Sequence, residues 1–113
     1  MIQRILAFAG CAVLCVTVVV AQKGKNAPGK GNAAKGKELS EQCLLCHSVD
    51  SPEKKLGPSL QGLFKRKTLQ NGKPVSDANV LAQINNGGNG MPAYQDTLSA
   101  DDKANLMAYL HTL

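Results

Sequence analysis

The chain has few large aromatic side chains, which limits the core that it can build. Its 113 residues include no tryptophan, two tyrosines and two phenylalanines. Phe8 lies in an apolar N-terminal run, so Phe64, Tyr94 and Tyr109 are the aromatic residues of the remaining chain. A domain of about eighty residues with so few large side chains buries little apolar surface unaided. The composition therefore predicts a bound group that completes the core.

Other absences exclude whole classes of function. There is no basic stripe interleaved with aromatic residues and no nucleic-acid motif, so no nucleic-acid partner is expected. The formal net charge of +5 comes mainly from the N-terminal region, because residues 33–113 hold nine basic and eight acidic side chains. The sequence has no nucleophile beside a base, no suggestive carboxylate pair and no phosphate-binding loop. We therefore expect no enzymatic activity.

The first 21 residues differ from the rest. Arg4 is their only charged residue, and an apolar run extends from Ile5 to Ala21. This pattern predicts an export signal cleaved after Ala21, and hence a periplasmic protein. The alternative is an uncleaved membrane anchor, because seventeen apolar residues reach the lower limit of a spanning helix. Residues 22–32, rich in Gly, Lys, Asn and Pro, predict a flexible basic linker, and residues 33–113 form the domain.

The domain has helical patterns and no convincing strand. Three segments are predicted to be helical: residues 33–43, 77–86 and 99–113. Ser76 or Asp77 can cap the second, which ends at Gly87. Ser99, with Asp102 three residues later, predicts a capping box for the third. The loops between them contain repeated Gly, Pro and Asn. The predicted fold class is all-α.

One motif dominates the chemistry of the domain. Cys43-Leu44-Leu45-Cys46-His47 has the spacing by which c-type haem is attached. Two thiols three residues apart at a helix end project to the same side, where they can add to the two vinyl groups of one porphyrin. The next residue, His47, is then held at the iron. We predict one haem c bound through two thioethers, with His47 as an axial ligand.

Two other kinds of site use the same spacing. A thioredoxin-like dithiol also has Cys-x-x-Cys, but it expects a strand–helix context that is missing here. A zinc site needs further Cys or His ligands, and outside residues 1–21 only His111 remains. Both alternatives therefore fit the sequence less well than haem.

The second iron ligand is predicted to be Met91. It lies in Gly90-Met91-Pro92, an irregular segment between two helices, where Pro92 fixes the backbone directly after it. The alternatives are a loop methionine that fills a gap and Met107, which the apolar face of the last helix already explains as core. His111, near the end of that helix, is expected to be solvated.

The motifs CLLCH and GMPAY, followed by LSADDKANLMAYL, resemble the class I cytochrome c family, as does the loop LGPSLQGLFKRK. The resemblance covers residues 33–113 and implies three to four helices wrapped around one haem. It implies that the Pro58 carbonyl accepts the Nδ1 proton of His47, and that Arg66 pairs with a haem propionate. The residues implied to line the macrocycle are Leu60, Leu63 and Phe64.

The resemblance also implies that the first and last helices cross, with Leu106 and Tyr109 at the contact. The family usually has a glycine eight residues before the first cysteine, whereas Gly36 precedes Cys43 by seven. Leu39 stands where an aromatic residue is common. The crossing is therefore the part of the fold that the sequence specifies least.

With His47 and Met91 on the iron, no coordination position is open, and electron transfer is the expected function. Thioether sulfur favours reduced iron and raises the potential. The expected partners are a protein donor and a protein acceptor, and the expected state is a monomer. The alternatives are a haem enzyme or gas sensor with an open sixth position, and a membrane-tethered module of a larger complex.

Overall fold

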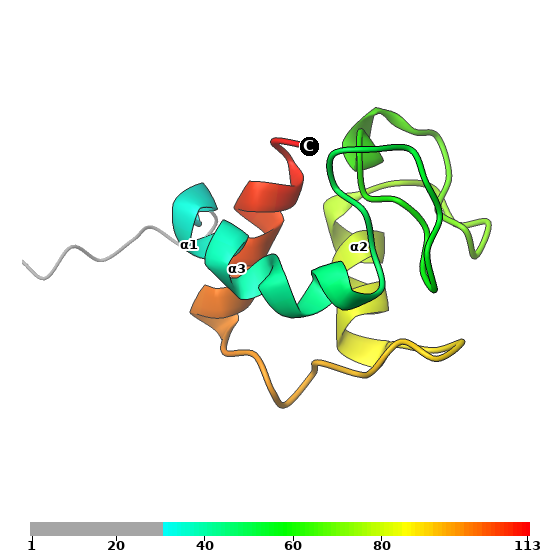
Figure 1. Cartoon of the computed structure of the whole chain (residues 1–113). Coiled ribbons are helices and arrows are strands. Elements are labelled where there is room, and N and C mark those ends of the chain that lie inside the picture. Colours follow the sequence, from blue (N-terminus) through cyan, green and yellow to red (C-terminus); the bar gives the residue numbers. More distant parts are fainter. Residues whose placement is uncertain (1–30) are drawn as a thin grey trace, which may run out of the picture.

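The structure is a computed structural model that describes residues 31–113, and its regular elements are helices joined by long loops (Figure 1). The elements are α1 (Ala33–Leu39), the 3₁₀ helices η1 (Ser40–Leu45) and η2 (Leu63–Lys65), α2 (Asp77–Asn86) and α3 (Ala100–Leu110). Over residues 31–113 there is no strand, and the only β pairing is two isolated bridges. The all-α prediction is confirmed. The predicted export signal and most of the predicted linker lie outside the described residues.

The first predicted helix is present as two pieces. Asn32 caps α1 by accepting a hydrogen bond from the Lys35 N–H, and its own N–H donates to Asn105 Oδ1 at 2.7 Å. At Ser40 the chain tightens into η1, and the Ser40 hydroxyl donates to the Lys37 carbonyl at 2.7 Å. This buried hydroxyl adds a side-chain donor to a carbonyl in the last turn of α1, where intrahelical donors run out. The cysteine motif therefore begins on a 3₁₀ turn.

Helices α1 and α3 pack against each other (Figure 1), and Gly36 lies at their contact. Gly36 is buried, and a Cβ atom there would overlap the Asn105 carbonyl and lie 2.8 Å from Tyr109 Cβ. The crossing therefore depends on a residue without a side chain. Gly36 fulfils the role of the helix-contact glycine although it is one residue closer to Cys43 than the resemblance implies, and Tyr109 lies at the contact as expected.

The other two α-helices begin where the sequence predicts. Ser76 caps α2 by accepting from the Asn79 N–H at 3.1 Å, and the helix ends at Gly87, which has a φ of 63°. Ser99 and Asp102 form both halves of a capping box at the start of α3. Each half satisfies an N–H group that would otherwise lack a partner.

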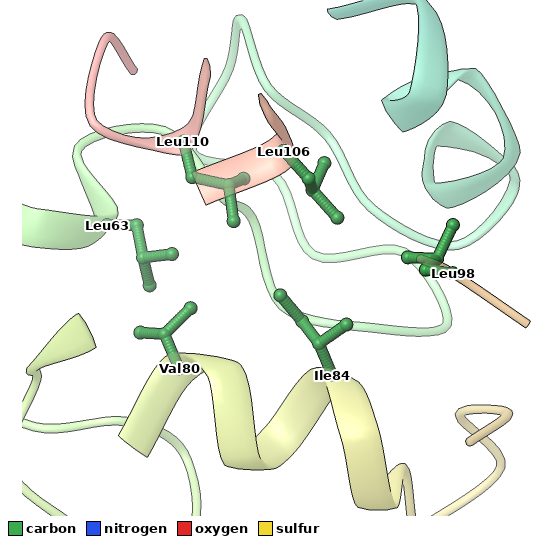
Figure 2. Close-up of a cluster of buried hydrophobic side chains, with 6 residues drawn as sticks. All are labelled: Leu63, Val80, Ile84, Leu98, Leu106 and Leu110. Atoms are coloured by element: carbon green, nitrogen blue, oxygen red, sulfur yellow. The ribbon is translucent and has the colours of Figure 1, made fainter. Parts of the chain in front are cut away.

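The core is small and apolar. Figure 2 shows six side chains that converge from η2, α2, α3 and the segment before α3. They are Leu63, Val80, Ile84, Leu98, Leu106 and Leu110. Nine further apolar side chains pack against this cluster while remaining partly exposed, among them Leu60, Phe64, Met91 and Tyr94. Because so much apolar surface around this core is only partly covered, a large apolar group can pack against it.

Candidate functional site

The two cysteines lie on a tight turn at the end of η1. The N–H groups of Cys46 and His47 both donate to the Cys43 carbonyl, at 3.1 and 2.9 Å. This turn fixes the positions of the two thiols and the imidazole relative to one another. Both cysteines are free thiols and both are partly buried.

The thiol chemistry argues against a redox dithiol. Burial, and secondly the neighbouring Cys46 thiol, raise the pKa of the Cys43 thiol above its ordinary value. A reactive cysteine has a lowered pKa, because the thiolate is the nucleophile. The pKa of Tyr94 is also raised, by burial and then by Cys43 and Cys46.

His47 is oriented by a backbone carbonyl and by a glycine. Its Nδ1 lies 2.6 Å from the Pro58 carbonyl oxygen. Because a carbonyl can only accept, Nδ1 carries the proton and the lone pair of Nε2 is left free for a metal. A Cβ at Gly57 would lie 2.5 Å from His47 Cε1 and 2.8 Å from Nδ1, so the Gly57 backbone packs directly against the ring. The hydrogen bond that the resemblance implies is present, whereas the contact with Gly57 was not anticipated.

The loop that carries Pro58 is tied back to the cysteine motif. The Gly57 N–H donates to the Cys46 carbonyl at 2.8 Å, and the Leu60 N–H donates to the Ser48 carbonyl at 2.7 Å. The buried Ser59 hydroxyl donates to the Ser51 carbonyl at 2.5 Å. These bonds hold the acceptor of the His47 proton in place from both sides.

Met91 is held by a two-residue turn. The N–H of Gly88 donates to the Met91 carbonyl at 2.9 Å, and the N–H of Met91 donates to the Gly88 carbonyl at 3.0 Å. The central residues, Asn89 and Gly90, have φ angles of 52° and 89°. Positive φ at both positions, with the sequence Asn-Gly, is the signature of a type I′ turn. The segment that looked irregular in the sequence is therefore a defined turn that fixes the backbone of Met91.

Gln83 is a site residue that the sequence analysis missed. Its side-chain amide donates to the Gly87 carbonyl at 2.9 Å and approaches Met91 Sδ at 3.9 Å. Its Oε1 accepts from the Asn71 amide at 3.2 Å. The sequence feature that indicates this role is the position of Gln83 on α2, one turn before the glycines that lead to Met91.

The remaining predicted site residues lie on or beside η2. Leu63 is buried in the core, whereas Leu60 and Phe64 pack against it and stay partly exposed. Arg66 is exposed, and its guanidinium donates to the Gln61 carbonyl at 2.6 Å. His111, expected to be solvated, is exposed, and its ring stacks on Phe64 with centroids 3.6 Å apart while its Nε2 hydrogen-bonds to Asp77.

The donor set fits a haem and does not fit zinc. Within residues 31–113 no three His, Cys, Asp or Glu side chains converge as metal ligands. What the site offers is two reduced thiols at haem-attachment spacing, an imidazole with Nε2 free, a thioether on a fixed turn, and half-covered apolar side chains. These are the groups that a covalently bound macrocycle requires. In the part of the chain that is described, no helix is long and apolar enough to cross a membrane.

Comparisons with known proteins agree with this chemistry. Residues 22–110 match the family model described as cytochrome c oxidase, cbb3-type, subunit III. The chain is 32% identical over 81 residues to cytochrome c6 of Diacronema lutheri, covering 71% of this chain and 94% of that protein. It is 47% identical over 51 residues to cytochrome c2 of Blastochloris viridis, covering 42% of this chain and 39% of that one. The solved structure of cytochrome c6 from Phaeodactylum tricornutum is similar, with a TM-score of 0.56 and 25% identity over 73% of this chain and 93% of that chain.

The helical fold and the cysteine motif define a small c-type cytochrome domain. The chain belongs to the cytochrome c family that the cbb3-type subunit III model describes. Its cofactor is one covalently attached haem c, and Cys43 and Cys46 have the attachment spacing. Its function is electron transfer, not enzymatic catalysis.

Proposed function

We propose that this protein is an exported, periplasmic carrier that transfers one electron at a time on a haem ligated by His47 and Met91. The observation that supports this proposal most directly is the hydrogen bond from His47 Nδ1 to the Pro58 carbonyl. It is 2.6 Å long and leaves Nε2 free for iron. The iron cycles between the ferric and ferrous states, accepting one electron from a donor protein and passing it to an acceptor protein.

Each site residue has a distinct proposed role. Cys43 and Cys46 hold the macrocycle through thioethers. Pro58 fixes the ring of His47, and a ligand held in one orientation keeps rearrangement on redox change small. Leu60, Leu63 and Phe64 exclude water from the macrocycle, which together with thioether ligation raises the potential.

Arg66 is proposed to pair with a haem propionate. Its guanidinium uses one of its donors on the Gln61 carbonyl, which orients the group and leaves further donors free. A guanidinium and a carboxylate form a strong forked pair. In this proposal Arg66 is the one cationic side chain assigned to a propionate.

The test of the ligand assignment is the visible spectrum of the haem-loaded protein. We expect a low-spin spectrum with the Met–iron(III) charge-transfer band when oxidised, and no response to carbon monoxide when reduced. Met91→Ala is expected to keep the covalent haem and lose the band, while Met107→Ala, the control, keeps both. A high-spin spectrum or ready carbon monoxide binding would instead indicate an open iron, as in a haem enzyme or gas sensor.

A second candidate is a membrane-tethered module of a larger complex. It is favoured by the apolar run from Ile5 to Ala21 and by the family description, which names an oxidase subunit. The mass of the protein isolated from its native host distinguishes the two. Loss of residues 1–21 with recovery in the soluble fraction supports the carrier, whereas an intact N-terminus in the membrane fraction supports the module.

A further inference from the structure

The chain contains three Asn-Gly pairs, and the structure places them in different surroundings. They are Asn71-Gly72, Asn86-Gly87 and Asn89-Gly90. In such a pair the backbone nitrogen of the glycine can attack the side-chain amide carbon of the asparagine, because glycine has no side chain to obstruct the approach. The reaction requires that this nitrogen and this amide are free to meet. The hydrogen bonds of each pair therefore decide where it occurs.

The first pair is held at both reacting groups. The Gly72 N–H donates to the Leu69 carbonyl at 2.9 Å, so the attacking nitrogen is engaged. The Asn71 side chain is engaged at both ends, because its nitrogen donates to Gln83 at 3.2 Å and its oxygen accepts from the Lys73 N–H at 3.0 Å. Reaction at this pair would require all three bonds to break.

The second pair is also held, whereas the third is free. The Gly87 N–H donates to the Gln83 carbonyl at 2.8 Å, and Asn86 is the last residue of α2, so its backbone is fixed by the helix. Asn89 and Gly90 are exposed at the tip of the turn before Met91. Among the hydrogen bonds of residues 31–113, none involves the Gly90 N–H or the Asn89 side chain.

We propose that Asn89 is a modification site, at which conversion to isoaspartate releases Met91 from the iron. The Gly90 nitrogen gives its proton to hydroxide and forms a bond to Cγ of Asn89. The Cγ–Nδ2 bond breaks, and ammonia leaves with a proton from water. Water then opens the five-membered imide: attack at the side-chain carbonyl gives aspartate, and attack at the main-chain carbonyl gives isoaspartate. One water is consumed for each ammonia released, and no electron is transferred.

The consequence for Met91 follows from the length of the turn. The N–H and carbonyl of Gly88 pair with the carbonyl and N–H of Met91, at 2.9 and 3.0 Å, across two residues. The length of such a loop fixes which groups can pair. Isoaspartate routes the chain through Cβ and Cγ and so adds one backbone atom. The base of the turn has no room to absorb it, because the Gly87 backbone packs directly against the carbonyls of Met91 and Pro92.

The modified protein would keep its haem through the two thioethers and have an open sixth position on the iron. This last step rests on the proposed ligation by Met91. The site of the modification and the loosening of the turn do not depend on it, because both follow from the hydrogen bonds of the turn.

The test is incubation of the full, haem-loaded chain in mildly alkaline buffer, followed over time by tandem mass spectrometry of its peptides and by the visible spectrum. Isoaspartate and aspartate are expected to accumulate at Asn89 before Asn71 or Asn86 reacts. In the chain unfolded in urea, which lacks the protecting bonds, all three pairs are expected to react. The Met–iron(III) band of the folded protein should decline in proportion to the isoaspartate fraction.

Two variants separate the causes. Asn89→Gly gives a Gly-Gly sequence that also suits this turn and has no amide, so its band should persist throughout the incubation. Asn89→Asp, measured when freshly prepared, introduces the charge of the product without the extra backbone atom and should keep the band. Earlier conversion at Asn71 or Asn86, or a full band in protein converted to isoaspartate at Asn89, would overturn the proposal.

A second readout does not involve the iron. The Met91 N–H, which donates to the Gly88 carbonyl, should exchange with deuterium faster in the converted protein than in the fresh protein. An unchanged exchange rate would contradict the loosening of the turn. Fresh protein that lacks the Met–iron(III) band would refute the ligation by Met91, while the peptide analysis and the exchange rate would still decide whether Asn89 reacts and the turn opens.

Discussion

At the scale of single residues, the site depends on backbone groups and one side-chain amide that orient His47 and Met91. The Pro58 carbonyl sets the tautomer of His47, the Gly57 backbone packs against its ring, and the amide of Gln83 reaches Met91. A hydrogen-bond partner of an iron ligand controls its orientation and its basicity. Substitutions at these supporting residues are therefore expected to change the iron spectrum while the covalent attachment through the cysteines persists.

Gly57→Ala is expected to displace His47. The added methyl group would lie 2.5 Å from Cε1 of the ring, and the hydrogen bond from Nδ1 to the Pro58 carbonyl would have to stretch for the ring to move away. Overpacking of this kind costs about 1–3 kcal/mol. The visible spectrum of the haem-loaded variant should show a high-spin fraction, and urea unfolding should begin at lower concentration. Lys54→Ala, in the same exposed loop, should change neither, and a wild-type spectrum in Gly57→Ala would refute the packing argument.

Gln83→Leu is expected to lower the midpoint potential. The Gln83 amide presents its positive end to the Met91 sulfur at 3.9 Å, which favours the iron state of lower charge. Removing it also frees the Gly87 carbonyl, so the turn that holds Met91 is loosened. Spectroelectrochemistry measures the potential, and the intensity of the Met–iron(III) band reports the ligand. Gln70→Leu, which is exposed, is the matched control. A potential equal to that of the wild type would show that the contact has no electronic effect.

At the scale of elements, the crossing of α1 and α3 closes the fold on the side away from α2 (Figure 1). The helices approach so closely at Gly36 that the Asn105 carbonyl occupies the place of a side chain. The Asn105 side chain also accepts from the Asn32 N–H, so one residue of α3 contacts both the start and the middle of α1. This crossing positions η1, and with it the cysteine motif.

Gly36→Ala is expected to destabilise the protein because its methyl group would overlap backbone, which cannot be repacked like a side chain. Alanine favours helix over glycine by about 1 kcal/mol, so a net loss of stability must come from the crossing. Urea unfolding of the haem-loaded variant, followed by circular dichroism, measures the change. Lys37→Ala, on the exposed face of the same helix, is the control. An increase in stability in Gly36→Ala would mean that the helices separate without cost.

At the scale of the whole molecule, the cofactor completes the core. Seven apolar side chains are buried within residues 31–113, and nine more pack against the core cluster only partly covered. Folding must overcome about 1–2 kcal/mol of backbone entropy for each ordered residue. A core of this size is therefore insufficient without the area that a macrocycle contributes.

Cys43→Ser combined with Cys46→Ser is expected to abolish cooperative folding. Without thioethers the haem is not retained, and the half-covered side chains face water. A small folded protein shows an unfolding slope of about 1–3 kcal/mol per molar urea, whereas the double variant should show no clear transition and little near-ultraviolet circular dichroism. The haem-loaded wild type is the reference. A cooperative transition of normal slope in the variant would show that the protein part folds alone.

The sequence by itself determined the fold class, the helix caps and the haem motif. Those features are local: Ser99 and Asp102 are three residues apart, and Cys43, Cys46 and His47 lie within five residues. Asn89-Gly90 was also readable as a type I′ turn, but its Gly-rich surroundings led to the prediction of an irregular segment.

Only the tertiary structure decided how distant segments meet. Gly57 beside His47, Gln83 beside Met91, and His111 between Phe64 and Asp77 all depend on the path of a loop or on the angle between helices. No residue type or spacing encodes such contacts, because each joins side chains or backbone whose separation in space is set by the packing of the whole core. Gly36 could be predicted in part from the sequence and in part only from the tertiary structure. Its identity indicates a close approach, but the overlap with Asn105 shows which helix approaches and where.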